Sequence, residues 1–356
     1  MAMTEGEKSL YMKLGERSEW LAVLESSIVI FLNVFSFTGN LLVCLAVYNN
    51  RRLRTIPNMF VVALAISDIL VSVLTMPFTA AILMAGRWLF DQKHQFCLFM
   101  GFCLFQCGVA SLLMMCQVAV NRYFCVVKPN LYRKIYKKRN TLILIILTWV
   151  LALAASIPPL LMKKGKYVFQ PGKGQCLFAF ETNVAFTIFL DVFYIATNMT
   201  IIAYCYFKVY QTVTSSNKRF RPNNKNMSKE EKKQLAANVE EAKVTKTLAG
   251  VVFAFACCWL PIGVIDTIDV FQGDTLLPRQ LYLTYGYLVF ISSTVNPFIY
   301  GILSPTFRRE YRRIVCGKTR FVSTGNESTS SDTGRTDKVS KETQKTEMST
   351  PHTAWK

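Results

Sequence analysis

The residues of this sequence best suited to chemistry are polar side chains that interrupt long apolar stretches. Asp68 lies midway along one such stretch, and Asn40, Ser111, Ser293 and Asn296 lie at comparable depths in three others. An ionisable side chain in so apolar a setting is costly and therefore points to function. Carboxylate, hydroxyl and amide oxygens are the ligands that hard cations prefer. These residues predict either a site for a monovalent cation such as sodium or a hydrogen-bonded cluster of water.

Two further acids are expected to face a pocket. Asp266 follows Trp259 by seven residues, about 20° from the same helical face. Asp191 precedes Tyr206 by fifteen residues, about 60° from that residue's face. The alternatives are that Asp266 reaches the water interface and that Asp191 bonds to a local hydroxyl group. The predicted pocket is mainly aromatic and apolar, and its members are Leu104, Phe105, Gly108, Phe180, Asp191, Tyr194, Trp259, Gly263, Asp266, Gly286 and Phe290.

Seven long apolar stretches must position these residues. A helix that crosses a bilayer needs about 20 mostly apolar residues, and seven runs qualify, roughly 22–48, 59–85, 97–127, 141–162, 183–210, 244–271 and 281–303. Burial inside a large soluble protein is the alternative, but short basic connections between the runs favour a membrane. With 52% hydrophobic residues the chain is too apolar for general disorder, and its 11 scattered Cys do not suit a disulfide framework. The sequence predicts an all-α integral membrane protein, a bundle of seven transmembrane helices over 22–303.

The positive charge of the chain predicts its orientation. Of 41 Lys and Arg residues, 31 lie after the first, third, fifth and seventh stretches or at their ends. Because cytoplasmic connections carry the excess of basic residues, these segments are expected inside and the N-terminus, 1–21, outside. The net charge of +19 is thereby explained by topology, so nucleic acid is not an expected partner.

A charged pair is predicted at the cytoplasmic edge. Arg122 ends the third stretch, although an Arg there could also simply extend to the membrane surface. Glu241 lies eighteen residues before Trp259, five helical turns down the same face, and is expected to pair with Arg122. The alternative is that Glu241 is a solvated charge at a loop end. Pro261 should kink the sixth helix, because proline removes a backbone hydrogen bond.

The order and spacing of these motifs resemble those of rhodopsin-like (class A) G-protein-coupled receptors over residues 22–316. The residues that carry the resemblance are Asn40, Asp68, Arg122, Trp149, Trp259, Pro261, Asn296, Pro297, Tyr300 and the pair Cys97 and Cys176. The resemblance implies a disulfide between the two cysteines and a plasma-membrane receptor that activates a heterotrimeric G protein. It also implies an activation switch that includes Arg122, Tyr206, Pro261, Pro297 and Tyr300.

The C-terminal residues suggest attachment and regulation. Residues 304–316 alternate aromatic and basic side chains, as in an amphipathic helix lying on the inner leaflet. Cys316, just beyond that run, is a candidate for palmitoylation. Residues 317–356 are predicted to be a disordered cytoplasmic tail, and its Ser and Thr residues, once phosphorylated by receptor kinases, would form an anionic docking site for arrestin.

Within the family the chain looks most like melatonin receptors, particularly at Asn121-Arg122-Tyr123, where Asn replaces the usual acid. That likeness favours inhibitory G proteins. It does not extend to the ligand: Pro159 and Phe180 replace the Asn and Gln that hold melatonin, and neither can donate a side-chain hydrogen bond. Leu104 replaces the Asp of amine receptors and Phe290 the Lys of opsins, so no retinal cofactor is expected.

These observations predict a receptor, not an enzyme, that transduces an extracellular small-molecule signal of unidentified chemistry. Two alternatives remain open at this point. One is a seven-helix transporter or ion- or proton-translocating protein in which Asp68 is a relay. The other is a decoy receptor that does not couple to G proteins.

Overall fold

The computed structural model describes residues 4–90, 95–162, 166–219 and 229–317, although most side chains between 216 and 248 lie outside the description. Within these residues seven helical segments are long and apolar enough to cross a membrane: Glu19–Asn49, Ile56–Ala85, Gln95–Val127, Lys138–Leu161, Val184–Ser215, Ala249–Gln272 and Arg279–Leu303. The predicted fold class is confirmed. The predicted tail, 317–356, lies outside the described part from residue 318 onward, and so does its arrestin site.

The spans are built from the helices α2 (Glu19–Asn49), α3 (Ile56–Leu74) with α4 (Met76–Ala85), α5 (Gln95–Val127), α7 (Lys138–Ser156) with α8 (Pro158–Leu161), α9 (Val184–Leu190) with α10 (Thr197–Arg219), α11 (Lys229–Gln272) and α12 (Arg279–Leu303). A π-helical turn, Asp191–Ala196, joins α9 to α10. Prolines near the start of α4 and α8 coincide with the interruptions of their spans. α11 and α12 continue through Pro261 and Pro297.

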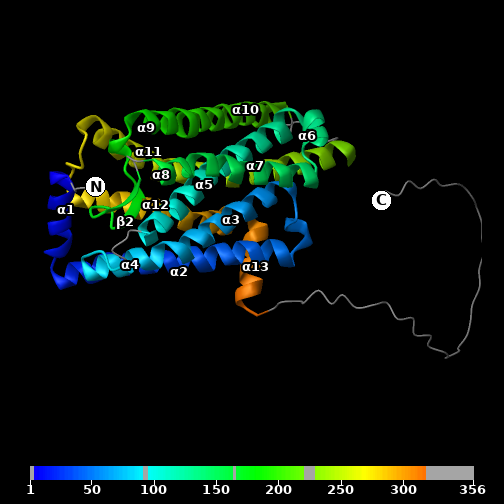
Figure 1. Cartoon of the computed structure of the whole chain (residues 1–356). Helices are drawn as coiled ribbons and strands as arrows, with labels where there is room; N and C mark the ends of the chain where they lie inside the picture. Colours follow the sequence, from blue (N-terminus) through cyan, green and yellow to red (C-terminus); the bar gives the residue numbers. More distant parts are fainter. Residues whose placement is uncertain (1–3, 91–94, 163–165, 220–228, 318–356) are drawn as a thin grey trace, which may run out of the picture. The chain divides into compact units, whose positions relative to one another are not determined.

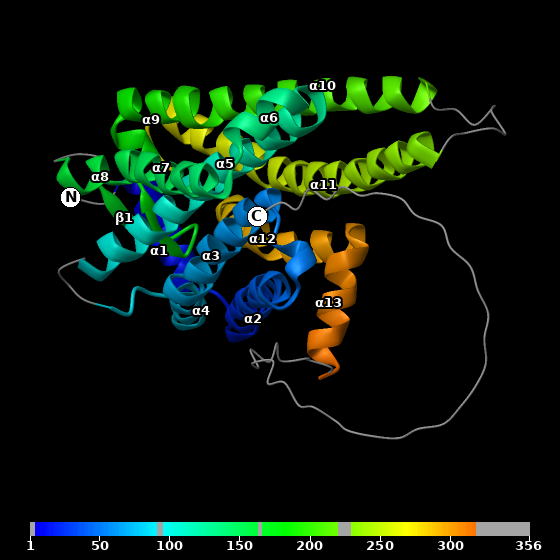
Figure 2. The same ribbon diagram turned by 90° about the vertical axis from the view of Figure 1, so that its right-hand side faces the viewer.

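The burial pattern is that of a membrane bundle. Side chains such as Ile146 and Val150 of α7 are more than half exposed, whereas Asn40, Asp68 and Arg122 are at most 2% exposed. Apolar atoms therefore face outward, where lipid would solvate them, and polar atoms face inward. The central helix α5 packs against α3, α7, α10 and α11 (Figure 2).

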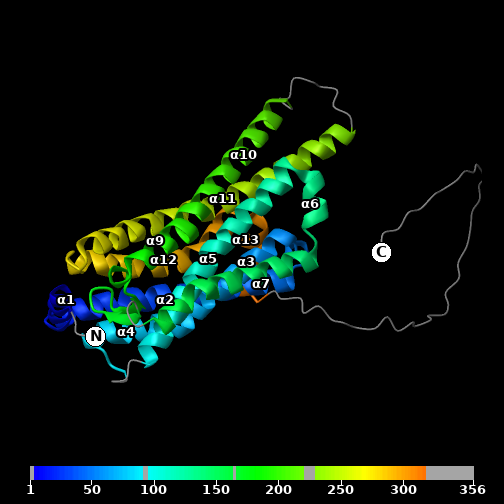
Figure 3. The same cartoon turned by 45° about the horizontal axis from the view of Figure 1, so that its top comes forward.

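Shorter elements lie at the two ends of the bundle. At one end, which we call the hairpin end, are α1 (Glu5–Gly15) and the strands β1 (Tyr167–Gln170) and β2 (Gln175–Phe178). At the other, which we call the α13 end, are the 3-10 turn Arg51–Leu53, α6 (Pro129–Ile135) and α13 (Pro305–Val315). Figure 1 shows α1 and α13 running across the direction of the bundle helices. α10 and α11 extend beyond their neighbours at the α13 end (Figure 3).

The strands and α1 are additions to the predicted all-α bundle. β1 and β2 pair antiparallel, with Tyr167 opposite Phe178 and Gln170 opposite Gln175. Thr4 caps the N-terminus of α1. Its side chain accepts a hydrogen bond from the Glu7 amide, while the Glu7 carboxylate accepts one from the Thr4 amide. This capping box satisfies two free amides of the first turn. Leu10 and Leu14 are buried on the other face of α1, against the bundle.

Candidate functional site

A disulfide fixes the hairpin on the bundle. Cys97 at the start of α5 is bonded to Cys176 in β2, with Cα atoms 5.4 Å apart, so the pairing implied by the resemblance is confirmed. The bond closes a loop of 79 residues, which in chain-entropy terms stabilises the fold by about 4 kcal/mol. Both cysteines are buried.

A cavity lies beneath the hairpin, between α5, the π-helical turn, α11 and α12. Its lining includes eight of the eleven predicted pocket residues: Leu104, Phe105, Gly108, Phe180, Asp191, Tyr194, Trp259 and Asp266. The structure also adds Tyr285 and Val289 from α12 and Leu177 from β2. Tyr285 had a sequence signal, because it lies eleven residues before Asn296, about 20° from the same helical face.

The other three predicted pocket residues do not line this cavity. A side chain at Gly263 would meet nothing within 4 Å, so this position does not face the packed interior. Gly286 is covered by the hairpin turn, since a Cβ atom there would lie 3.0 Å from the Lys173 carbonyl oxygen. Phe290 is 1% exposed and packs in the apolar core of the hairpin end.

Asp266 is buried and paired rather than exposed to water, which answers the alternative left open by the sequence. It is 6% exposed. Its carboxylate accepts a hydrogen bond from the Tyr285 hydroxyl at 3.0 Å and lies 3.3 Å from the Lys173 ammonium. Asp191 lines the same cavity from the π-helical turn, a distortion that is frequent at functional sites.

The predicted sodium site forms a polar cluster in the middle of the bundle. Asn296 Nδ2 donates to Asp68 Oδ2 at 2.9 Å, and the hydroxyls of Ser67 and Ser111 are 3.1 Å apart. Asn40 donates to the Ser293 carbonyl at 3.0 Å. Asp68 therefore meets Asn296 directly, and Ser293 also acts on its carboxylate. Ser111 joins the cluster through Ser67, the residue before Asp68.

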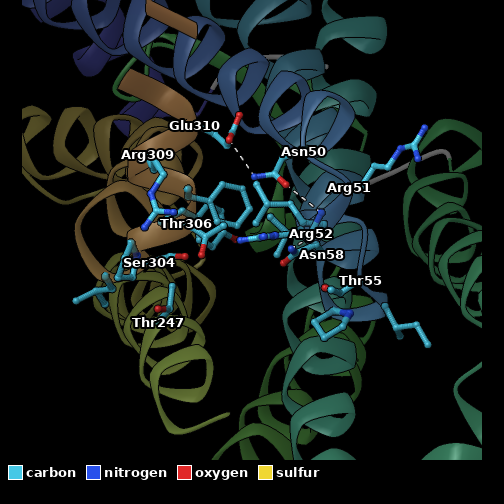
Figure 4. Close-up of a pocket in the computed structure, with 18 of the residues that line it drawn as sticks. Asn50, Arg51, Arg52, Thr55, Asn58, Thr247, Ser304, Thr306, Arg309 and Glu310 are labelled. Atoms are coloured by element: carbon cyan, nitrogen blue, oxygen red, sulfur yellow. Dashed lines mark hydrogen bonds between the residues drawn. The ribbon is translucent and has the colours of Figure 1, made fainter. Parts of the chain in front are cut away.

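A second cavity, of about 800 Å³, opens at the α13 end. It is basic, because its lining includes one acid, Glu310, and the arginines Arg51, Arg52, Arg122, Arg309 and Arg313. Asn50 donates to Glu310 at 3.0 Å and so links α13 to the end of α2 (Figure 4). Tyr300 of α12 also lines the cavity.

The predicted switch residues lie between the two cavities and at the α13 end. Trp259 lines the hairpin-end cavity, and its ring stacks on Phe255 with centroids 5.3 Å apart. Tyr206 and Tyr300 pack in one apolar cluster near the α13 end. Pro297 packs against Gly39 of α2, where a Cβ atom would come within 2.9 Å of the proline ring. Glu241 belongs to α11, but its side chain lies outside the described residues, so its pairing with Arg122 stays a prediction.

Comparison with known proteins identifies the family. The model of the 7 transmembrane receptor (rhodopsin family) matches residues 39–300, most of the chain. The chain belongs to the rhodopsin family of seven-transmembrane receptors. It is therefore a class A G-protein-coupled receptor, not an enzyme, and the transporter alternative is excluded.

Melatonin receptors are among the most similar relatives of this receptor. The melatonin receptor type 1A of Ovis aries is 32% identical over 317 residues, covering 87% of this chain and 83% of its own. The type 1A receptor of Mus musculus is 32% identical over 318 residues, covering 87% and 86%. The type 1B receptor of Mus musculus is 26% identical over 302 residues, covering 84% and 79%. The predicted resemblance is confirmed at this level, and the ligand is not specified by it.

Proposed function

We propose that this receptor spans the plasma membrane with its hairpin end outside. We further propose that a small-molecule ligand in the hairpin-end cavity controls docking of a heterotrimeric G protein at the α13 end. The orientation is supported by the distribution of basic residues, since the segments that meet at the α13 end hold most of the Lys and Arg.

The basic cavity at the α13 end is the observation that carries the proposal. One turn of α-helix, taken as a cylinder about 10 Å wide and 5.4 Å long, occupies roughly 400 Å³. A cavity of about 800 Å³ therefore has room for the end of a partner helix. Its arginines suit acidic side chains or a terminal carboxylate, to which guanidinium groups bind through paired hydrogen bonds.

Trp259 and α11 offer a route between the two cavities. A ligand that contacts Trp259 differently in two states of the bundle shifts their populations by its difference in affinity, and a few kcal/mol suffice. α11 runs without interruption from Trp259 toward the α13 end. The sequence Asn121-Arg122-Tyr123 leads us to propose the inhibitory class of G protein, with arrestin and receptor kinases acting on the tail.

The test is a panel of G-protein activation assays on cells that display the receptor, with indoleamines, other amines, lipids and peptides as candidate ligands. We expect one ligand class to activate inhibitory G proteins. The matched control is Arg122→Ala, which should lose the response at equal surface display. If normally displayed receptor activates no G protein with any ligand and without ligand, the decoy interpretation replaces this proposal.

A further inference from the structure

The turn of the hairpin places a lysine inside the bundle. Lys173 lies in the turn between β1 and β2, and its side chain is only 3% exposed. Its ammonium nitrogen is 3.3 Å from Asp266 Oδ1. Lysine is almost never fully buried unless it is paired, so the ion pair with Asp266 makes the buried position of Lys173 possible.

Three aromatic rings complete the surroundings of the Lys173 ammonium. The nitrogen lies 4.0 Å from the ring centre of Tyr285, 5.7 Å from that of Tyr282 and 5.9 Å from that of Phe180. All three distances are within the range of about 6 Å in which a cation is attracted to a ring face. The Tyr285 hydroxyl also donates to Asp266, so ring and acid form one unit. One carboxylate with a cage of aromatic rings is the chemistry that binds organic ammonium ions.

The turn fits its position closely. Gly174 has a φ of +65°, which glycine adopts without strain. A Cβ atom at Gly174 would lie 2.7 Å from Leu83, and one at Gly172 would lie 2.9 Å from Tyr282. Leu10 and Glu7 of α1 lie beside the turn. The close packing of the turn thus places the Lys173 side chain next to Asp266.

The hairpin leaves little free space in the hairpin-end cavity. The remaining volume next to Asp266 is about 70 Å³, whereas ligand sites usually measure about 300–1,000 Å³. A small molecule must therefore displace part of what now fills the site. The group that lies on its buried acid is Lys173.

We propose that Lys173 is a tethered cation that occupies the ammonium subsite of the ligand pocket, and that the external ligand is an organic ammonium ion whose head group takes its place on Asp266. The subsite stands on the geometry alone, while the statement about the external ligand rests on the proposed receptor function. Displacement would release the turn, and with it the cover of the pocket.

Chemical rescue of purified full-length receptor tests the subsite. Lys173→Ala empties it, and n-butylammonium, which matches the lysine side chain, should refill it. At about pH 8, which favours the ionised form of a carboxyl group over a lower pH, we expect Lys173→Ala to melt below the wild type. Millimolar n-butylammonium chloride should then raise its melting temperature by about 2–4 °C, whereas equal sodium chloride should not.

Two variants serve as matched controls. Lys173→Met fills the space with an uncharged chain, and Lys173→Ala combined with Asp266→Asn removes the acid, so neither should respond to n-butylammonium. If Lys173→Ala does not fold, n-butylammonium in the culture medium should restore its surface display, again only when Asp266 is present.

The proposal is overturned if n-butylammonium rescues Lys173→Ala by neither measurement, or rescues it equally without Asp266. Stabilisation of the wild type by butyrate would instead indicate an anionic ligand on Lys173 and overturn the ammonium assignment. Rescue without any G-protein response supports the subsite and counts against the proposed function. A G-protein response without rescue supports the proposed function and counts against the subsite.

Discussion

Asp68 is almost completely buried, and the oxygens around it are not all used by the protein. The side-chain oxygens of Asn40 and Asn296 are buried and have no hydrogen-bond partner among the described residues. A buried acceptor left without a partner costs free energy, so this cluster suits a cation or water molecules that would use these oxygens.

We predict that sodium lowers ligand-free signalling and that Asp68→Asn abolishes the effect, because the amide carries no charge to hold the ion. Couplings between sites usually change affinity or population by about fivefold or more, and an effect of that size should appear in G-protein activation measured across sodium concentrations. Asp191→Asn is the control, since it removes an acid from the hairpin-end cavity and should leave the sodium dependence intact. Equal sodium curves for the wild type and Asp68→Asn would favour the water cluster.

Glu181 lies outside the membrane spans, in the 3-10 turn Phe180–Thr182, and is half-buried. Burial raises the pKa of its carboxyl from 4.5 to about 7, although its own backbone hydrogen bond and Lys173 oppose the shift and Glu7 and Asp269 add to it. The folded state therefore holds a proton that the unfolded chain loses at lower pH. The resulting stabilisation is complete below about pH 4.5 and is lost as pH rises through about 7.

We predict that the melting temperature of the receptor falls between pH 5 and pH 8 and that Glu181→Gln flattens this decline, because glutamine does not titrate. Thermal unfolding of the purified protein across that range measures the effect. An identical decline in Glu181→Gln would show that other groups control the pH dependence.

At the scale of elements, an ion cluster holds the N-terminal segment, α2 and α12 together. Arg279 binds Glu25 through two hydrogen bonds of 2.8 and 2.5 Å, and Arg17 pairs with the same carboxylate. Arg17 also donates to the Leu14 and Leu83 carbonyls. Burial lowers the pKa of Arg17, and Glu25 opposes that change. One buried acid thus compensates two arginines.

We predict that Glu25→Gln destabilises the receptor by about 3–5 kcal/mol, because removal of one partner leaves buried charge uncompensated. The melting temperature should fall by roughly 10 °C. Glu19→Gln on the first turn of α2 is the matched control, since that side chain is exposed and should change little. A stability of Glu25→Gln equal to that of the control would mean that the cluster does not fasten α1 to the bundle.

At the scale of the whole molecule, Arg122 is the residue whose ion pair with Glu241 is predicted to stabilise the inactive state at the α13 end. It is 2% exposed, and Asn121 accepts a hydrogen bond from it at 3.3 Å. Asn121 offers an amide where an acid would pair more strongly. Glu241 of α11 is the predicted acidic partner of Arg122, because it lies eighteen residues before Trp259, five helical turns down the same face.

We predict that Glu241→Gln raises ligand-free signalling and that Asn121→Asp lowers it by restoring a local acid. A change of about 1.4 kcal/mol against the inactive state raises a rare active population nearly tenfold. G-protein activation without ligand, at matched surface display, measures both variants. Glu240→Gln is the control and should have a smaller effect. If neither Glu241→Gln nor Asn121→Asp changes basal activity, this contact is absent.

The sequence by itself determined the seven spans, and eight of the eleven residues that it predicted for a pocket line one cavity. Apolar length is a local property, so each stretch predicts its own helix whatever its neighbours do. Helical periodicity then places Leu104 and Gly108 on one face of α5, and the structure brings them to one cavity with Trp259 of α11. The Cys97–Cys176 bond came from the family resemblance, which supplied the partner that spacing could not.

Only the tertiary structure decided what fills and covers that pocket. Lys173 lies 93 residues from Asp266, and Glu25 lies 254 residues from Arg279. In the sequence, Lys173 and Arg17 resemble the solvated charges of any loop, and their neighbouring residues do not indicate that Asp266 and Glu25 are their partners. Whether such a charge is hydrated or buried depends on whether the fold places an acid from another segment next to it. The positions of the hairpin and of α1 bring Lys173 and Arg17 to such acids, and a buried charge is stable only when its partner is buried with it.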